Sequence, residues 1–146
     1  MTRINKKILY PDLCYKLTGL FFKTHSKLGR FCREKQYSDE LERLFKDHSI
    51  NYKREFELQN LMPEEFIKGN KIDFLINNDV LVEIKAKKFV TKEDYYQMMR
   101  YLESGNLELG LIVNFRNSYL KPKRILNSKF YSDNSDANSG YSGRLL

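Results

Sequence analysis

The chain has 146 residues, of which 41% are hydrophobic and 14% aromatic, enough for one domain with its own core and too apolar for a disordered protein. It has no run of 18 apolar residues, and no apolar segment follows its basic N-terminus, so neither a membrane span nor a secretory signal is expected. Cys14 and Cys32 lack metal-ligand spacing, which favours reduced thiols in a cytoplasmic protein.

The formal charge of +7 lies near the N-terminus. Residues 1–35 contain nine Lys or Arg and two Asp or Glu, whereas the rest of the chain contains seventeen of each. This asymmetry favours a polyanionic partner, because each neutralised phosphate releases counterions. A solvated basic helix face explains the charge equally well.

Two helices are expected first. Apolar residues recur at helical spacing over 11–28, where Pro11 suits a first turn and Gly29 a helix end. A second amphipathic pattern covers 33–47. Alternating polarity then predicts a strand over 50–58 with one exposed face, although Arg54 interrupts its apolar side.

A group of strands follows. Gly69-Asn70 is a hairpin turn pattern, so strands over 65–68, 71–76 and 80–86 are expected to pair antiparallel in sequence order. An Asn-Asn-Asp turn joins the last two.

The remaining elements alternate helix and strand. Thr91 and Asp94 resemble a capping box, which predicts a helix to Ser104 that stops at Gly105. The apolar run 109–115 predicts a buried strand reached by a helical crossover, and a short strand is expected over 124–126. Residues 132–146 are rich in Ser, Asn, Asp and Gly, which predicts a disordered tail after a single domain over 1–131.

Together these elements predict an α+β (mixed α/β) fold. Its central mixed sheet contains a three-stranded antiparallel meander and is flanked by helices.

Three charged residues interrupt the apolar hairpin. Asp73 lies on one strand, and Glu83 and Lys85 lie on the next with one apolar residue between them. Side chains alternate faces along a strand, so Glu83 and Lys85 point the same way. Charge in such apolar surroundings is costly unless it is paired or bound to metal.

Phosphodiester hydrolysis needs an activated water and stabilisation of negative charge, and Mg²⁺ or Mn²⁺ held by carboxylates supplies both. Asp73 and Glu83 meet the ligand requirement of magnesium, with the Ile84 carbonyl as a third oxygen. Lys85 is placed to position the water or to stabilise developing charge. By themselves, the three residues are explained more simply by a structural salt bridge between Lys85 and one of the carboxylates.

Residues elsewhere in the chain reverse that preference. Glu34 lies near the start of the second helix, and Gln97 and Tyr101 lie one turn apart on the third. The full set resembles the PD-(D/E)xK nuclease superfamily, in its RecB-like branch. This resemblance implies a restriction-endonuclease-like core and an active site of Asp73, Glu83, Lys85, Glu34 and Gln97. It also implies that Glu34 tunes a metal held by Asp73 and Glu83 through a bridging water.

Within that superfamily the chain resembles the small GxxExxY family. Its hallmark, His-x-x-Leu-Gly-x-x-x-x-Glu-x-x-Tyr, is matched by His25-Ser26-Lys27-Leu28-Gly29-Arg30-Phe31-Cys32-Arg33-Glu34-Lys35-Gln36-Tyr37. The segments Val82-Glu83-Ile84-Lys85-Ala86, Leu109–Phe115 and Leu120–Ile125 also match in type and order. One residue departs: Phe31 stands where the family has the glycine of its name, and a phenylalanine disfavours a positive φ beside Glu34.

Accessory roles follow from the same resemblance for His25, Tyr37 and Tyr101. His25 contacts a phosphate or lends a proton, unless it is a structural helix histidine. Gln97 holds Lys85 or a phosphate, unless it is an exposed amide, and Tyr101 fits the core as well as it fits a phosphate.

Basic residues provide candidate phosphate contacts. Lys87 and Lys88 extend the Glu-x-Lys strand, and Lys121, Lys123 and Arg124 form a second group, although surface solvation explains both.

The expected function is therefore Mg²⁺- or Mn²⁺-dependent hydrolysis of nucleic acid, DNA more than RNA, by a deoxyribonuclease. The superfamily often acts as dimers, so a homodimer is one expected arrangement. The alternative is an inactive nucleic-acid-binding or protein-interaction module that retains the nuclease fold.

Overall fold

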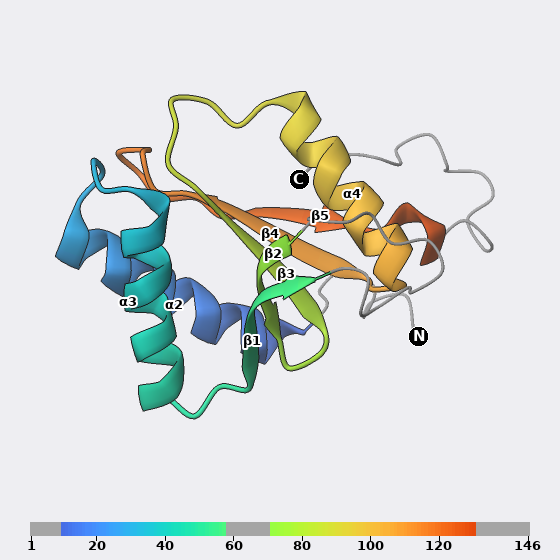
Figure 1. Ribbon diagram of the computed structural model, residues 1–146, viewed down its shortest axis with the longest axis horizontal. Helices are drawn as coiled ribbons and strands as arrows, with labels where there is room; N and C mark the ends of the chain where they lie inside the picture. Colours follow the sequence, from blue (N-terminus) through green and yellow to red (C-terminus); the bar gives the residue numbers. More distant parts are fainter. Residues whose placement is uncertain (1–9, 58–70, 131–146) are drawn as a thin grey trace.

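The computed structural model describes residues 10–57 and 71–130. In chain order these form α2 (Pro11–Leu28), α3 (Glu34–Asp47), β1 (Tyr52–Glu57), β2 (Lys71–Ile76), β3 (Val80–Lys85), α4 (Lys92–Gly105), β4 (Leu109–Asn114), β5 (Lys123–Leu126) and the 3-10 helix η3 (Ser128–Phe130) (Figure 1). None of the helices in these ranges is long and apolar enough to cross a membrane. Cys14 and Cys32 are half-buried and are not joined by a disulfide.

The five strands form one mixed sheet in the order β1-β2-β3-β4-β5. Neighbouring strands are antiparallel except for β3 and β4, which are parallel and are joined by the crossover helix α4. The predicted α+β fold is confirmed, as is the helical crossover.

The prediction of a three-stranded antiparallel meander is confirmed, but the strand predicted to come first in it is wrong. Its members are β1, β2 and β3, and β1 rather than residues 65–68 is the partner of β2. The 65–68 segment, the Gly69-Asn70 turn and the tail at 132–146 lie outside the described residues.

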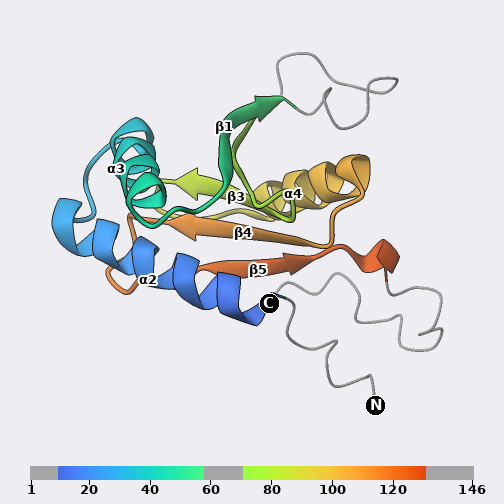
Figure 2. The ribbon, with the colours of Figure 1, turned by 90° about the horizontal axis from the view of Figure 1, so that it is seen from below.

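The sheet lies between two helical layers, with α2 and α3 on one face and α4 on the other (Figure 2). On β3, Leu81 packs on the α4 side, whereas the α2/α3 side receives Val80, Val82 and Ile84. By this alternation Glu83 and Lys85 belong to the α4 side, as predicted for two residues of one strand face.

The turns explain why the helices and the hairpin end where they do. Asn77 and Asn78 both have positive φ (54° and 59°), as in a type I′ turn, and the Asp79 N–H closes this turn by donating to the Ile76 carbonyl at 2.8 Å. Gly29 ends α2 with φ 80°, as expected. The capping box of Thr91 and Asp94 starts α4, but the helix continues through Gly105 and ends at Asn106, which takes the left-handed conformation.

Gly110 allows α4 to approach the sheet closely. A Cβ atom at Gly110 would overlap the Sδ atom of Met98 and lie 2.9 Å from its Cγ. Met98 is almost fully buried between α4 and β4, so its side chain has little room to move away.

We expect Gly110→Ala to destabilise the protein by about 1–3 kcal/mol, because the added methyl overpacks the α4 layer. In a Met98→Ala background the same change should cost much less, since the methyl then enters the vacated space. Urea unfolding of the four proteins of this double-mutant cycle measures the coupling. Additive costs would show that Met98 is not the obstacle.

Candidate active site

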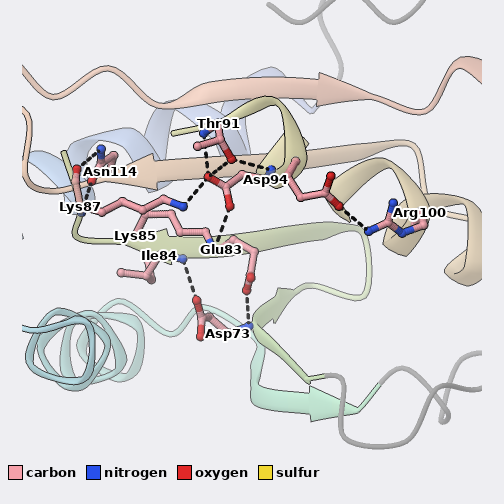
Figure 3. A network of polar contacts seen from close by, with 10 residues as sticks. Asp73, Glu83, Ile84, Lys85, Lys87, Thr91, Asp94, Arg100 and Asn114 are labelled. Atoms are coloured by element: carbon pink, nitrogen blue, oxygen red, sulfur yellow. Dashed lines mark hydrogen bonds and ion pairs between the residues drawn. The ribbon is translucent and has the colours of Figure 1, made fainter. Parts of the chain in front are cut away.

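The strands β2 and β3 separate at the predicted site. Their backbone pairing runs from Ile76 and Val80 to Phe74 and Val82 and stops there. At the next position carboxylates replace the backbone partners (Figure 3). The Ile84 N–H donates to Asp73 Oδ2 at 2.7 Å, and the Asp73 N–H donates to Glu83 Oε1 at 3.0 Å. These reciprocal bonds hold a fork between the two strands, and we refer to Asp73 and Glu83 as the fork carboxylates.

The same point is where β2 changes face. Ile72 packs in the α4 layer, whereas Phe74 packs in the α2/α3 layer, although residues two apart in a regular strand share one face. The neighbouring Glu55 on β1 has φ 52°, a conformation that costs a non-glycine residue roughly 1–2 kcal/mol. The regular backbone of β1 and β2 is therefore interrupted at the level of Asp73.

Burial and proximity set the charge of the fork carboxylates. Burial, together with the neighbouring Asp73 carboxylate, raises the pKa of Glu83 to about 8. The Asp73 backbone N–H and the Lys85 ammonium act in the opposite direction and only partly offset this. The two carboxyl groups are thus so close together that ionisation of both is unfavourable.

This donor set fits a divalent cation. Magnesium needs only one or two protein carboxylates in addition to water and substrate oxygens, and its charge would relieve the repulsion at the fork. Within residues 10–57 and 71–130, no group of three or more His, Cys, Asp and Glu side chains is arranged as a metal site. Glu34 therefore does not complete a three-carboxylate cluster with Asp73 and Glu83.

Lys85 is held by a residue that was not predicted as part of the site. Its Nζ lies 3.7 Å from Asp94 Oδ1, and Lys87 Nζ lies 2.6 Å from Asp94 Oδ2 (Figure 3). Asp94 Oδ2 also accepts the Thr91 N–H at 2.8 Å. The start of α4 is thereby tied to the end of β3.

Asn114 is a second residue that was not predicted. Its Oδ1 accepts the Lys87 N–H at 3.1 Å and its Nδ2 donates to the Lys87 carbonyl at 2.8 Å, as an adjacent strand would do. It is buried at the end of β4, where it pairs with Lys85 in the parallel ladder. This pair of bonds fixes the backbone just after the Glu-x-Lys segment.

Glu34 lies at the first position of α3, next to the fork. Partial burial and the Asp73 carboxylate raise its pKa, against the opposing effects of Lys85, Lys87 and a backbone hydrogen bond from Ala86. Glu34 thus lies within electrostatic range of Asp73 and Lys85, without completing a group of three metal ligands among the described residues.

Gln97 and Tyr101 come together on the face of α4 that covers the fork. Tyr101 is buried, and its pKa is raised by that burial and by the Glu83 and Asp73 carboxylates, while a hydrogen bond with Gln97 lowers it. The predicted one-face arrangement of the pair is present, with Tyr101 both in the core and next to the carboxylates.

His25 and Tyr37 make structural contacts. His25 Nε2 lies 3.0 Å from the Asn117 carbonyl oxygen. Tyr37 is fully buried, stacks on Phe115 at 4.3 Å, and its hydroxyl donates to the Gly29 carbonyl at 2.5 Å. Both residues therefore fix the α2–α3 turn and the segment after β4.

The basic residues do not form one surface. Lys123 pairs with Ile112 and lies on the α4 face, whereas Arg124 lies on the α2 face with Nη1 3.5 Å from Cys14 Sγ. Lys88 and Lys121 are exposed, and Lys87 is the member of these groups that reaches the site.

A sequence pattern could have indicated Asp94 but not Asn114. Asp94 was recognised as a capping residue, and its second role depends on the crossover that returns α4 to β3. Asn114 occurs in an apolar run, where only the registry of β4 with β3 shows its contact with Lys87.

Asp94→Asn tests the electrostatic part of this link. Burial alone would raise the pKa of Asp94, but Lys87, the Thr91 N–H and Lys85 outweigh it and lower the pKa. The resulting stability is present above the unfolded-state pKa of about 4 and is lost as pH falls through the lower folded-state value. We expect Asp94→Asn to cost about 1 kcal/mol at neutral pH, and less below about pH 3, in urea unfolding. A cost that stays constant with pH would contradict the charge contribution.

Comparison with known proteins agrees with this geometry. No curated protein and no solved structure matches the chain significantly. A family model described as the PD-(D/E)XK nuclease superfamily matches residues 11–125, which include both helical layers, the first four strands and most of β5. Because this match covers well over half of the chain, the protein belongs to the PD-(D/E)XK nuclease superfamily.

Proposed function

We propose that the protein is a Mg²⁺- or Mn²⁺-dependent nuclease that hydrolyses phosphodiester bonds, with DNA as the main substrate. The observation that carries this proposal is the fork, where the half-buried Asp73 and Glu83 adjoin and Lys85 extends from the same strand face as Glu83. The repulsion between the two carboxylates costs stability, and a bound cation would remove that cost, so their placement is better explained by a ligand.

Each residue of the site has a distinct task. Asp73 and Glu83 would hold the cation, which when bound supplies charge stabilisation and an acidified water. Lys85 neutralises negative charge at the scissile phosphate or orients the attacking water. Glu34 accepts hydrogen bonds at the edge of the cluster, and Gln97 positions the Tyr101 hydroxyl beside the carboxylates.

One observation favours the alternative, an inactive nucleic-acid-binding module. Lys85 faces Asp94, and both fork carboxylates accept backbone N–H bonds, so these groups also have structural partners. Binding of DNA without metal-dependent cleavage would support this alternative.

We further propose that the chain belongs to the GxxExxY family within the superfamily. Gly29, Glu34 and Tyr37 take positions suited to their motif: a helix end with positive φ, the start of α3 beside the fork, and a buried ring under the turn. Phe31 is not one of the described residues with positive φ, so the backbone there does not require the glycine of the family.

Cleavage of labelled single- and double-stranded DNA in Mn²⁺ tests the nuclease proposal. We expect Asp73→Ala and Lys85→Ala to lower the rate by about 100-fold or more, because the first removes a ligand of the cation and the second removes a positive charge at the reacting phosphate. Lys16→Ala, an exposed residue of α2, is the matched control and should keep full activity. If wild type and both site variants cleave DNA at the same rate, the assignment of the active site to Asp73 and Lys85 is wrong.

Glu83→Gln distinguishes a metal ligand from a structural ion pair. The amide oxygen can still accept the Asp73 N–H, while the repulsion between the carboxylates disappears. We therefore expect the melting temperature in EDTA to rise by roughly 2–4 °C, and stabilisation by Mn²⁺ to be lost. A lower melting temperature in EDTA would show that the Glu83 charge serves the fold.

A further inference from the structure

The turn between α2 and α3 carries an exposed aromatic ring with two arginines beside it. Phe31 is 74% exposed. The guanidinium carbons of Arg30 and Arg116 lie 5.0 and 5.5 Å from its ring centroid, within the range of cation–π contacts. Arg30 Nε also donates to the Arg116 carbonyl at 2.7 Å, which ties this turn to the segment that follows β4. We call these three residues the Arg-Phe-Arg cluster.

The cluster carries positive charge without a compensating carboxylate. Neither Arg30 nor Arg116 forms an ion pair with Asp or Glu in the described parts of the chain, whereas Arg43, Arg54 and Arg100 all do. The buried Nε of Arg116 has no hydrogen-bond partner there either. Two cations held together in this way favour an anionic ligand.

The cluster adjoins the candidate active site. Phe31 precedes Glu34 by three residues, and the Glu34 carboxyl interacts with Asp73 and Lys85. On the other side, Arg116 follows Asn114, which binds the Lys87 backbone. Figures 1 and 2 show the α2–α3 turn and the segment after β4 at the same end of the sheet.

From these contacts we propose that the Arg-Phe-Arg cluster is a base-stacking platform for single-stranded nucleic acid. The aromatic ring and the guanidinium planes stack on an unpaired base, and the remaining N–H groups bind the adjoining phosphates. The bases of a duplex are already stacked and paired, so the platform selects an unpaired strand. The inference rests on the proposed nuclease function, for which it names the substrate class.

Binding without metal tests the platform separately from cleavage. The probe is a fluorescein-labelled oligothymidylate of about 20 nucleotides in EDTA, followed by anisotropy. We expect Phe31→Ala to weaken binding by about 10-fold, because one stacked base is lost. Phe22→Ala, an exposed phenylalanine of α2, is the control and should bind as wild type. Two further probes, a duplex of equal length and an abasic strand, offer no unpaired base. For each of them the affinity of Phe31→Ala should equal that of wild type.

A spectroscopic readout comes from the composition of the chain. It contains no tryptophan, so Phe31→Trp introduces a single indole at the platform. Its fluorescence should be quenched when oligothymidylate is added, whereas that of Phe22→Trp should not change. Three results would overturn the platform. Phe31→Ala could bind oligothymidylate with wild-type affinity, or it could lose as much affinity for the abasic strand as for oligothymidylate. The fluorescence of Phe31→Trp could also stay unquenched.

The two proposals fail in different ways. Asp73→Ala should lose cleavage in Mn²⁺, whereas Phe31→Ala should lose affinity for oligothymidylate in EDTA, where no cleavage occurs. Unchanged cleavage by Asp73→Ala would refute the assigned nuclease site without affecting the EDTA binding result. Loss of cleavage by Asp73→Ala together with unaffected binding by Phe31→Ala would refute the platform alone.

Discussion

The reciprocal bonds between Asp73 and the β3 backbone, and between Glu83 and the β2 backbone, are the constraint on which the site depends. An antiparallel pair normally continues its ladder, and here the ladder stops because carboxylate oxygens replace carbonyl oxygens as acceptors. The strands can then separate without leaving these two N–H groups unpaired. The carboxylates that complete these hydrogen bonds are also the groups that repel each other at the candidate site.

The neighbouring elements hold this fork in place. β3 also pairs in parallel with β4, and Asn114 at the end of β4 extends that support to the Lys87 backbone. Asp94 belongs to the capping box at the start of α4 and also lies near Lys85 and Lys87 at the end of β3. One carboxylate therefore both caps the helix and helps to position Lys85. Gly110 lets α4 lie close enough to the sheet to cover the site.

Several features follow directly from local sequence. The helix end at Gly29, the Asn77-Asn78 hairpin turn and the Thr91 capping box depend on conformational preferences of a few adjacent residues. The partner of β2 was assigned wrongly because strand pairing depends on contacts between distant segments. The Gly69-Asn70 turn pattern favoured the adjacent 65–68 segment, whereas the actual partner, β1, lies further away in the chain.

The sequence by itself determined the superfamily, which the family match confirms, and it supplied the candidate site residues: Asp73, Glu83 and Lys85 in an apolar hairpin, with Glu34, Gln97 and Tyr101 on helices. Tertiary structure alone decided how these residues are held. The contact of Asp94 with Lys85 and the contact of Arg116 with the Phe31 ring join different elements, and the face change of β2 depends on which helical layer each of its residues meets. Periodicity describes one element at a time, whereas such contacts depend on the relative placement of several elements.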